Sequence, residues 1–279
     1  LTSITIKHEG KNTALSSLRV AGGSTTELTA TGWYYGNKVY SADTSFTWSV
    51  SDALGTIDED GTFTAVQTGR DVTGTLTVTY GETSCTLSVT VGSSQPFDDT
   101  KGHWAESYIT ELYYAGTLQG SEKNGKLYYR PDASMTRQEF IVAMMRYLGT
   151  DLSAYASVQL PFDDSGSIAS WAKSAMQAAY QLGYLTGSKT NGKLLAKPGS
   201  TISRQEAMTI LSRTKDFADA DLNVLSAFSD SGKIADWART ALAQMTQQKI
   251  ISGSKGKLNP TGKVTRAEVA KMLYMLSES

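Results

Sequence analysis

Three copies of one short motif carry the residues of this sequence that are best suited to chemistry. They are Thr136-Arg137-Gln138-Glu139, Ser203-Arg204-Gln205-Glu206 and Thr265-Arg266-Ala267-Glu268. A hydroxyl residue with glutamate three positions later is a capping box, which marks the start of a helix. Capping does not explain the arginine, because the helix dipole disfavours a cation in the first turn. A guanidinium placed there three times predicts an anion-binding site, in which its N–H groups pair with a ligand carboxylate.

The arginines also have a structural explanation, so two alternatives stay open. Arg137, Arg204 and Arg266 either form salt bridges between neighbouring copies or bind a ligand together with the N–H groups of the helix N-termini. The adjacent Gln138 and Gln205 join the arginines as candidate ligand-binding residues. The three glutamates are assigned to capping.

Three further sets of candidate ligand-binding residues recur once in each copy. Trp104, Trp171 and Trp237 are either core residues or exposed platforms for a ligand, with the indole N–H donating. Asp99, Asp164 and Asp230 either cap the tryptophan-bearing helix or accept hydrogen bonds from a ligand. Gly120-Ser121, Gly187-Ser188 and Gly253-Ser254 are expected to end the first helix of each copy, as plain glycine C-caps or as backbone that a ligand can approach.

The elements that position these residues have a helical period. Phe140, Met144 and Leu148 form an apolar stripe after the first capping box, and a proline precedes each box at 131, 198 and 260. Three copies of one unit predict a pseudo-threefold assembly, in which each unit buries its apolar stripes against the other two.

Residues 1–92 have the alternation of β-strands instead, as in Thr75-Leu76-Thr77-Val78-Thr79. About seven short strands in roughly 100 residues is the size of an immunoglobulin-like sandwich. Phe46-Thr47-Trp48-Ser49-Val50 and Gly55-Thr56-Ile57-Asp58 resemble segments of bacterial immunoglobulin-like domains, with Trp48 expected in the core. A linker is predicted at residues 93–96, in Ser93-Ser94-Gln95-Pro96.

The remaining residues closely resemble S-layer homology domains, the wall-anchoring repeats of bacterial surface proteins. The first copy matches the family pattern with Phe97, Asp99, His103-Trp104-Ala105, Gly116, Gly120, Pro131 and the first capping box. The repeats are expected at residues 97–156, 157–222 and 223–279. The resemblance implies an all-α three-prong domain with ligand grooves between the prongs, so the fold class predicted for the chain is multidomain, an all-β sandwich followed by an all-α domain.

The copies depart from one another in ways that put equal affinity of the three grooves in doubt. Ser170 and Asp236 stand before Trp171 and Trp237 where the first copy has His103. Lys249 replaces the glycine found at 116 and 183.

Composition excludes several function classes. A net charge of -1 gives no nucleic-acid footprint, and no apolar run is long enough to span a membrane. Two histidines far apart support no Ser-His-Asp arrangement and no metal site, and the acidic stretch Asp58-Glu59-Asp60-Gly61 fits a hairpin turn better than a calcium loop. A chain that starts Leu1-Thr2-Ser3 is read as a mature or excised piece of a longer protein.

The resemblance therefore implies a non-enzymatic module of the extracellular cell wall that needs no cofactor. It implies binding to an acidic secondary cell-wall polysaccharide, commonly through a pyruvylated amino sugar. Two alternatives remain, a lattice-forming S-layer protein with lateral self-association and, less favoured, an enzyme of glycan processing.

Overall fold

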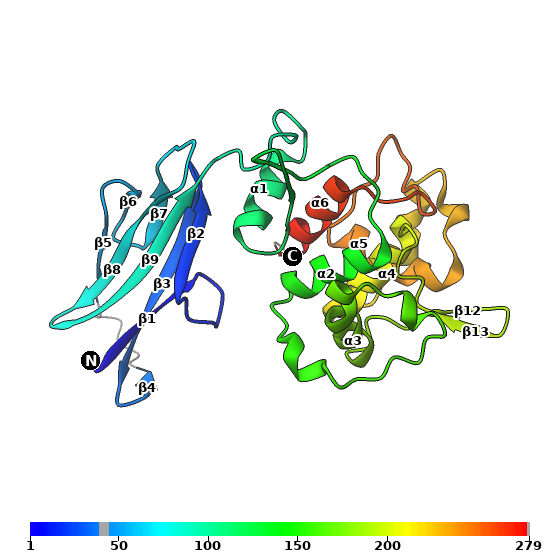
Figure 1. Ribbon diagram of the computed structural model, residues 1–279, viewed down its shortest axis with the longest axis horizontal. Coiled ribbons are helices and arrows are strands. Elements are labelled where there is room, and N and C mark those ends of the chain that lie inside the picture. Colours follow the sequence, from blue (N-terminus) through cyan, green and yellow to red (C-terminus); the bar gives the residue numbers. More distant parts are fainter. Residues whose placement is uncertain (39–44, 278–279) are drawn as a thin grey trace. The chain divides into compact units, whose positions relative to one another are not determined.

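The computed structural model describes residues 1–38 and 45–277, which form two compact units (Figure 1). The first unit covers Leu1–Lys101 and Tyr113–Ala115, and the second covers residues 102–112 and 116–277. The change from a strand period to a helical period along the sequence therefore accompanies a division of the chain into two bodies.

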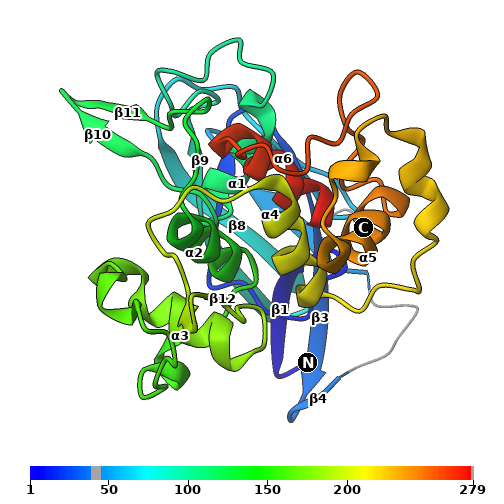
Figure 2. The ribbon, with the colours of Figure 1, turned by 90° about the vertical axis from the view of Figure 1, so that its right-hand side faces the viewer.

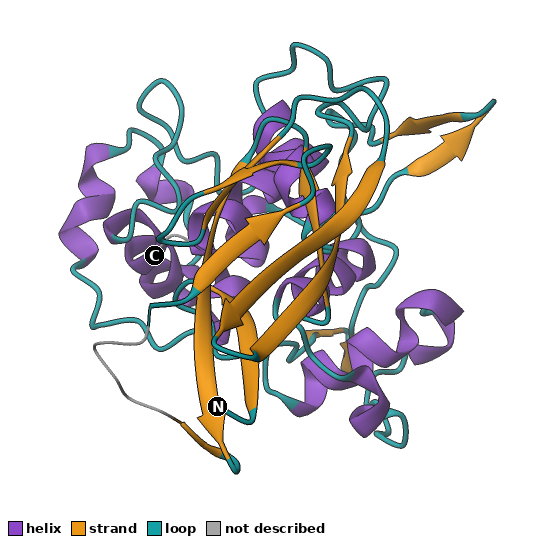
Figure 3. Ribbon diagram, turned by 90° about the vertical axis from the view of Figure 1, so that its left-hand side faces the viewer, coloured by secondary structure: helices purple, strands orange, loops and turns teal. Residues whose placement is uncertain are grey.

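Two sheets build the first unit (Figure 3). One has the order β1 (Ser3–His8), β3 (Thr25–Tyr34), β7 (Thr62–Ala65) and β6 (Gly55–Ile57), with β4 (Asn37–Lys38) pairing with β3. The other has the order β2 (Ser17–Ala21), β9 (Thr83–Gly92), β8 (Val72–Tyr80) and β5 (Thr47–Val50). The pairing of β2 with β9 is parallel, and the other pairings are antiparallel.

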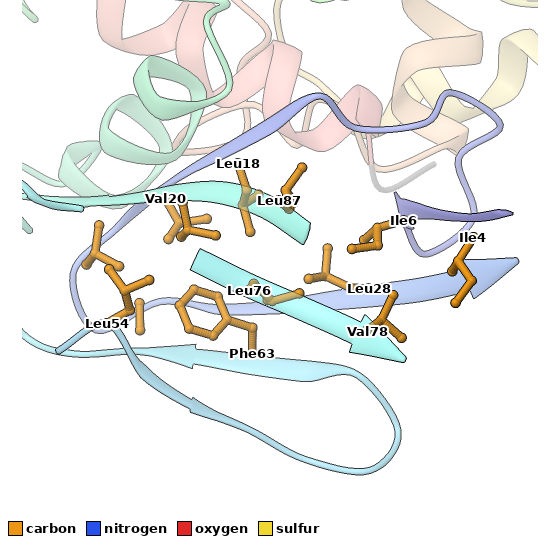
Figure 4. Packing of buried hydrophobic residues seen from close by; sticks show 13 residues of the cluster. Ile4, Ile6, Leu18, Val20, Leu28, Leu54, Phe63, Leu76, Val78 and Leu87 are labelled. Carbon is orange, nitrogen blue, oxygen red and sulfur yellow. The ribbon is translucent and has the colours of Figure 1, made fainter. Parts of the chain in front are cut away.

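Alternating apolar residues of both sheets meet in one hydrophobic cluster. On β8 and β9 the inward positions Leu76, Val78, Leu87 and Val89 are buried, while the polar residues between them, Thr77 and Ser88, are on the opposite face. Phe63 lies among these side chains from the opposite sheet (Figure 4). Each such side chain contributes about 1.5–3 kcal/mol when it leaves water. Trp48, which was expected in the core, packs against this cluster but is only partly buried.

The second unit consists of short helices and two hairpins (Figure 2). The α-helices are α1 (Glu106–Tyr114), α2 (Arg137–Tyr147), α3 (Lys173–Gln181), α4 (Arg204–Leu211), α5 (Arg239–Gln247) and α6 (Arg266–Ser277). The 3-10 helices are η1 (Leu152–Tyr155), η2 (Ser165–Ser167), η3 (Ser170–Ala172), η4 (Ser212–Thr214), η5 (Leu222–Ala227), η6 (Ser231–Lys233) and η7 (Asp236–Ala238). The hairpins are β10 (Ser121–Lys123) with β11 (Lys126–Tyr128), and β12 (Ser188–Thr190) with β13 (Lys193–Leu195).

The residues just before the capping boxes join the three repeats around one axis. Met135 N–H donates to the Val264 carbonyl (3.1 Å), Val264 N–H to the Ile202 carbonyl (3.2 Å), and Ile202 N–H to the Met135 carbonyl (3.0 Å). These three hydrogen bonds form a closed ring, and all three side chains are buried. The pseudo-threefold arrangement predicted from the repeats is therefore present as a backbone connection, with α2, α4 and α6 starting beside it.

The predicted fold class is wrong. Helices make up 31% and strands 27% of the structure, and the repeats that were expected to be all-α carry β-hairpins. Asn124-Gly125 and Asn191-Gly192 have φ values of 54°, 72°, 50° and 76°. Positive φ at both central residues is the type I′ turn that closes two-residue hairpins, and Asn-Gly is its usual sequence. The prediction did not take these pairs into account.

The immunoglobulin-like sandwich predicted for residues 1–92 is likewise not established. Two sheets share a core, but strand alternation alone does not determine which strand pairs with which. The number and size of strands on which the prediction relied are common to many two-sheet arrangements, so they could not identify one topology.

Lys249 provides a test of backbone strain in the second unit. Lys249 follows α5 and has a φ of 58°, and the equivalent residue after α3 in the second repeat is Gly183, with a φ of 78°. This left-handed conformation costs a non-glycine residue roughly 1–2 kcal/mol, and the flexibility of glycine in the unfolded chain offsets about 0.5–1 kcal/mol of that. We expect Lys249→Gly to raise the free energy of unfolding by about 0.5–1 kcal/mol, measured from urea unfolding midpoints at unchanged m-value.

The matched control is Gly183→Lys, which introduces the same strain in the second repeat. A Cβ at Gly183 would meet nothing within 4 Å, so any loss of stability comes from the backbone conformation. A stabilising Gly183→Lys or a destabilising Lys249→Gly would contradict the prediction.

Candidate functional site

The three arginines of the capping boxes each reach the glutamate of another repeat. The pairs are Arg137 with Glu206 (Nη2–Oε1, 2.5 Å), Arg204 with Glu268, and Arg266 with Glu139 (Nη1–Oε1, 3.9 Å). The first repeat thus contacts the second, the second the third, and the third the first. The arginine side chains are largely buried, with 11% to 17% exposed. This is the arrangement expected from the structural explanation of the arginines, and we call it the arginine–glutamate ring.

Each glutamate also caps its own helix. Glu206 Oε2 accepts hydrogen bonds from the backbone N–H and hydroxyl of Ser203, at 2.8 and 2.7 Å. Burial acts to raise the pKa of Glu206, but the Ser203 hydroxyl, the Arg137 guanidinium and the Ser203 N–H together hold the pKa below its usual value. One carboxylate therefore serves both the start of a helix and the contact between two repeats.

The N–H groups in the first turn of these helices are already bonded. Arg137 N–H donates to the Ser200 carbonyl (2.9 Å) and Gln138 N–H to the Pro198 carbonyl (3.0 Å). The same pair of bonds recurs at Arg204 and Gln205, and at Arg266 and Ala267. The expected contribution of these helix N-termini to an anion site is therefore not supported, because carbonyl groups of the neighbouring repeat occupy them.

The recurring aspartates hold backbone rather than a helix cap. The carboxylate oxygens of Asp164 accept from the N–H groups of Ala196 and Lys197, both at 2.8 Å. In the third repeat Asp230 accepts in the same way from the N–H groups of Leu258 and Asn259, at 2.9 and 2.8 Å. Neither makes a side-chain cap to the 3-10 helix that follows it. Asp99 stands at the equivalent place in the first repeat. The carboxylates of Asp164 and Asp230 thus fix the turns before Pro198 and Pro260.

The glycine–serine pairs were predicted to end the first helix of each repeat, and this prediction is wrong. Helix α3 ends at Gln181 and is followed by Gly183 in the left-handed conformation, whereas Ser188 begins strand β12. A Cβ on Gly187 would lie 2.6 Å from Phe162 Cε1, and one on Gly253 would lie 2.8 Å from Phe228 Cε1. Glycine is required at positions 187 and 253 because φ is positive there and because Phe162 or Phe228 approaches the backbone closely.

The three tryptophans are exposed, which disfavours the core alternative. Trp104, Trp171 and Trp237 leave 55%, 58% and 58% of their surface accessible. Gln138 Oε1 accepts from Ala169 N–H, two residues before Trp171, at 3.0 Å. Gln205 Oε1 accepts in the same way from Ala235 N–H, two residues before Trp237, at 3.0 Å. The glutamines therefore position the turns η3 and η7 that carry two of the tryptophans.

Two cavities bring predicted residues from all three repeats together. The larger, about 320 Å³, is lined by Arg137 of the first repeat, by Gly187, Ser188, Glu206 and Arg213 of the second, and by Trp237 of the third. The other, about 270 Å³, is lined by Gly120, Ser121, Glu139 and Arg146 of the first repeat, Trp171 of the second and Arg266 of the third. We call them the repeat-2 groove and the repeat-1 groove, after the repeat that contributes most residues.

Arg146 and Arg213 also line these grooves, and neither was among the residues predicted from the sequence. Each lies seven residues after the glutamate of its capping box, so two helical turns place both residues on one face. This spacing was the signal that could have found them. Asp164, Asp230, Gln138 and Gln205, by contrast, act on the backbone that supports the grooves.

The described part of the chain has neither a candidate metal site nor a candidate membrane span. Within residues 1–38 and 45–277 no cluster of three histidine, cysteine or acidic side chains could hold a metal ion. No helix within these residues is long and apolar enough to cross a membrane. Asp58 Oδ1 accepts from the N–H groups of Asp60 and Thr62, at 3.1 and 2.8 Å, which makes this acidic stretch a turn.

Comparison with known proteins identifies the repeats. Residues 96–141, 161–208 and 227–270 match the S-layer homology domain. An amylopullulanase of Thermoanaerobacterium thermosulfurigenes is 28% identical over 72% of this chain and 10% of its own length. The exoglucanase XynX of Acetivibrio thermocellus is 29% identical over 84% of this chain and 21% of its own length. The surface-layer 125 kDa protein of Lysinibacillus sphaericus is 32% identical over 65% of this chain and 15% of its own length. The chain thus spans only about a tenth to a fifth of the length of these relatives.

Breaking the arginine–glutamate ring tests the structural role of the arginines. We expect Arg137→Ala to lower the free energy of unfolding by about 1.5–3 kcal/mol, because a charge-assisted hydrogen bond is lost. A carboxyl group whose folded pKa is lowered stabilises the fold above its unfolded pKa, near 4.3, and this contribution is lost as pH falls through the folded pKa. The difference between the variant and the wild-type chain should therefore be largest above about pH 5 and narrow below about pH 4, in thermal melts across pH.

The control for this prediction is Arg146→Ala, which removes an exposed cation of the other groove that is not part of the arginine–glutamate ring. It should change stability by less than about 0.5 kcal/mol. A stability difference for Arg137→Ala that stays constant from pH 3 to pH 7 would contradict the ion-pair explanation.

Proposed function

This chain carries three tandem S-layer homology domains, and we propose that they bind an acidic cell-wall polysaccharide in the grooves between repeats. The chain is a cell-surface protein associated with the cell wall. Its S-layer homology domains are anchoring modules, which supports attachment of a surface protein to the wall rather than catalysis by these repeats. Attachment of this kind is non-covalent and depends on the groove residues.

The observation that carries the proposal is the composition of the two grooves. Each combines an exposed tryptophan, a glycine–serine backbone segment and guanidinium groups that come from different repeats. A tryptophan face packs against the apolar side of a sugar ring, and guanidinium groups bind carboxylates. A sugar that bears a carboxylate satisfies both requirements.

The finer proposal is a pyruvylated amino sugar. Its ketal would offer a methyl group to Trp171 or Trp237 and a carboxylate to the arginines, while the glycine–serine segments approach the ring. Gly120, Ser121, Gly187 and Ser188 supply that backbone from the start of a hairpin strand. The first unit is proposed as a spacer with no part in wall binding.

A second candidate is a lattice-forming surface-layer protein, because one relative is a surface-layer protein at 32% identity. Lateral self-association would then accompany wall binding. Regular sheets of the purified chain in electron micrographs would favour this candidate, and a monodisperse solution at high concentration would exclude it. A glycan-processing enzyme is less favoured, since this chain matches only small parts of the glycanases among its relatives.

The proposal predicts that wall binding requires the polysaccharide and not peptidoglycan. We expect the chain to sediment with purified sacculi that retain the polymer and to stay in solution with sacculi from which mild acid has stripped it. A variant with both Trp171→Ala and Trp237→Ala is expected to lose at least tenfold in affinity, because stacking on each exposed ring contributes about 1 kcal/mol or more. Trp104 is exposed but lines neither of the two grooves, so Trp104→Ala is the matched control and is expected to bind like the wild-type chain.

Equal binding to both kinds of sacculi would refute the proposal. Loss of binding by the double tryptophan variant counts only if its thermal midpoint remains close to that of the wild-type chain. All three tryptophans are more than half exposed, so their removal is expected to leave the fold intact.

A further inference from the structure

One arginine in each groove has no carboxylate partner. Arg213 lines the repeat-2 groove, where its Nη1 donates to the Tyr184 carbonyl (2.8 Å) and lies 3.4 Å from Thr186 Oγ1. Arg146 lines the repeat-1 groove. Neither forms an ion pair with any acidic side chain of residues 1–38 and 45–277. The arginines of the arginine–glutamate ring, in contrast, each face a glutamate.

Both unpaired guanidinium groups are partly withdrawn from water. Their side chains remain exposed, yet burial by neighbouring atoms lowers the pKa of Arg146 and of Arg213. Both stay charged at neutral pH, because arginine does not lose its proton in proteins. A cation that has lost part of its hydration without gaining an anion is unfavourable by itself and favours the binding of one.

The balance of charge differs among the repeats at this position. In the repeat-1 groove, which Arg130 also lines, Arg266 faces Glu139 and the charge of Arg146 has no acidic partner among the described residues. In the repeat-2 groove Arg137 faces Glu206, which leaves the charge of Arg213. In the third repeat Arg204 faces Glu268, and the residue seven positions after that glutamate is Met275. The third repeat therefore has no excess cation at the equivalent place.

The hydrogen bond that positions the turn before each tryptophan also distinguishes the third capping box from the other two. Gln138 and Gln205 hold the turns before Trp171 and Trp237, but the corresponding residue of the third capping box is Ala267. The alanine side chain has no hydrogen-bond acceptor, so the turn that bears Trp104 lacks the side-chain hydrogen bond that the glutamines provide at the other two turns. Two independent substitutions thus separate the third repeat from the other two.

We propose that Arg146 and Arg213 bind the carboxylate of the ligand, and that the third repeat, which has Met275 and Ala267 at the equivalent places, does not take an acidic ligand. This inference rests on the proposed function and specifies it further. It predicts two carboxylate-binding sites per chain, and it assigns the decisive charge to Arg146 on α2 and Arg213 on η4 rather than to the arginine–glutamate ring.

Calorimetric titration of the full chain tests the inference. The probe is a soluble fragment of purified wall polysaccharide, used with its carboxylates intact and after methyl esterification. The wild-type chain should bind two intact fragments. Arg146→Ala and Arg213→Ala should each weaken one site ten- to hundredfold, and the double variant should weaken both.

The esterified fragment separates direct binding from a structural effect. It should bind weakly to the wild-type chain, and Arg146→Ala or Arg213→Ala should weaken it no further, since the carboxylate is already neutral. Met275→Ala is the matched control from the third repeat and should leave both sites unchanged. The combination Met275→Arg with Ala267→Gln should add a third site for the intact fragment.

Full-strength binding of the intact fragment by the double arginine variant would overturn the inference and leave the proposed function standing. Three equal sites in the wild-type chain would also overturn it. No binding of the intact fragment by the wild-type chain, together with equal binding to stripped sacculi, would instead overturn the proposed function. Thermal melts of each variant verify that binding is lost from a folded chain.

Discussion

The second unit depends on the contact between each capping-box glutamate and the arginine of another repeat. A helix N-terminus with an arginine in its first turn is unfavourable in isolation, because the dipole repels the cation. In this protein a carboxylate from the next capping box compensates that charge, and carbonyl groups from the same neighbour accept the first-turn N–H groups. None of these contacts exists within a single repeat. The capping box within each repeat starts the second helix, and the neighbouring repeat adds the contacts that stabilise its first turn, which couples local helix formation to assembly of the whole unit.

The closed ring of backbone hydrogen bonds at Met135, Ile202 and Val264 has the same consequence. Three bonds in a cycle fix the relative positions of three repeats more firmly than three bonds in a row, because opening any one repeat breaks two of them. The grooves lie beside this rigid centre, and each takes its arginine, its backbone segment and its tryptophan from different repeats. Precise placement of these groups reduces the ordering required on binding.

The helix starts were predictable from the sequence because a capping box is a local signal, and α2, α4 and α6 begin at Arg137, Arg204 and Arg266 as expected. The helix ends were misassigned to Gly120, Gly187 and Gly253, although Gly183 offers an earlier left-handed residue after α3. The Asn-Gly hairpins were also local signals, and their omission made the all-α assignment wrong. The partner of each arginine could not be predicted, because it depends on which repeat stands next to which in space.

The arrangement separates residues that build the scaffold from residues that adjust the grooves. Arginine and glutamate of the ring cancel each other in all three repeats, so changing either would disturb the assembly. The residue seven positions after the glutamate takes no part in these inter-repeat ion pairs, since Arg146 and Arg213 pair with no carboxylate of the described residues. Substitution there changes the net charge beside the ring by one unit without removing an inter-repeat contact. A threefold scaffold can in this way carry grooves of different charge, and the identity of one side chain near the end of each second helix decides which charge that is.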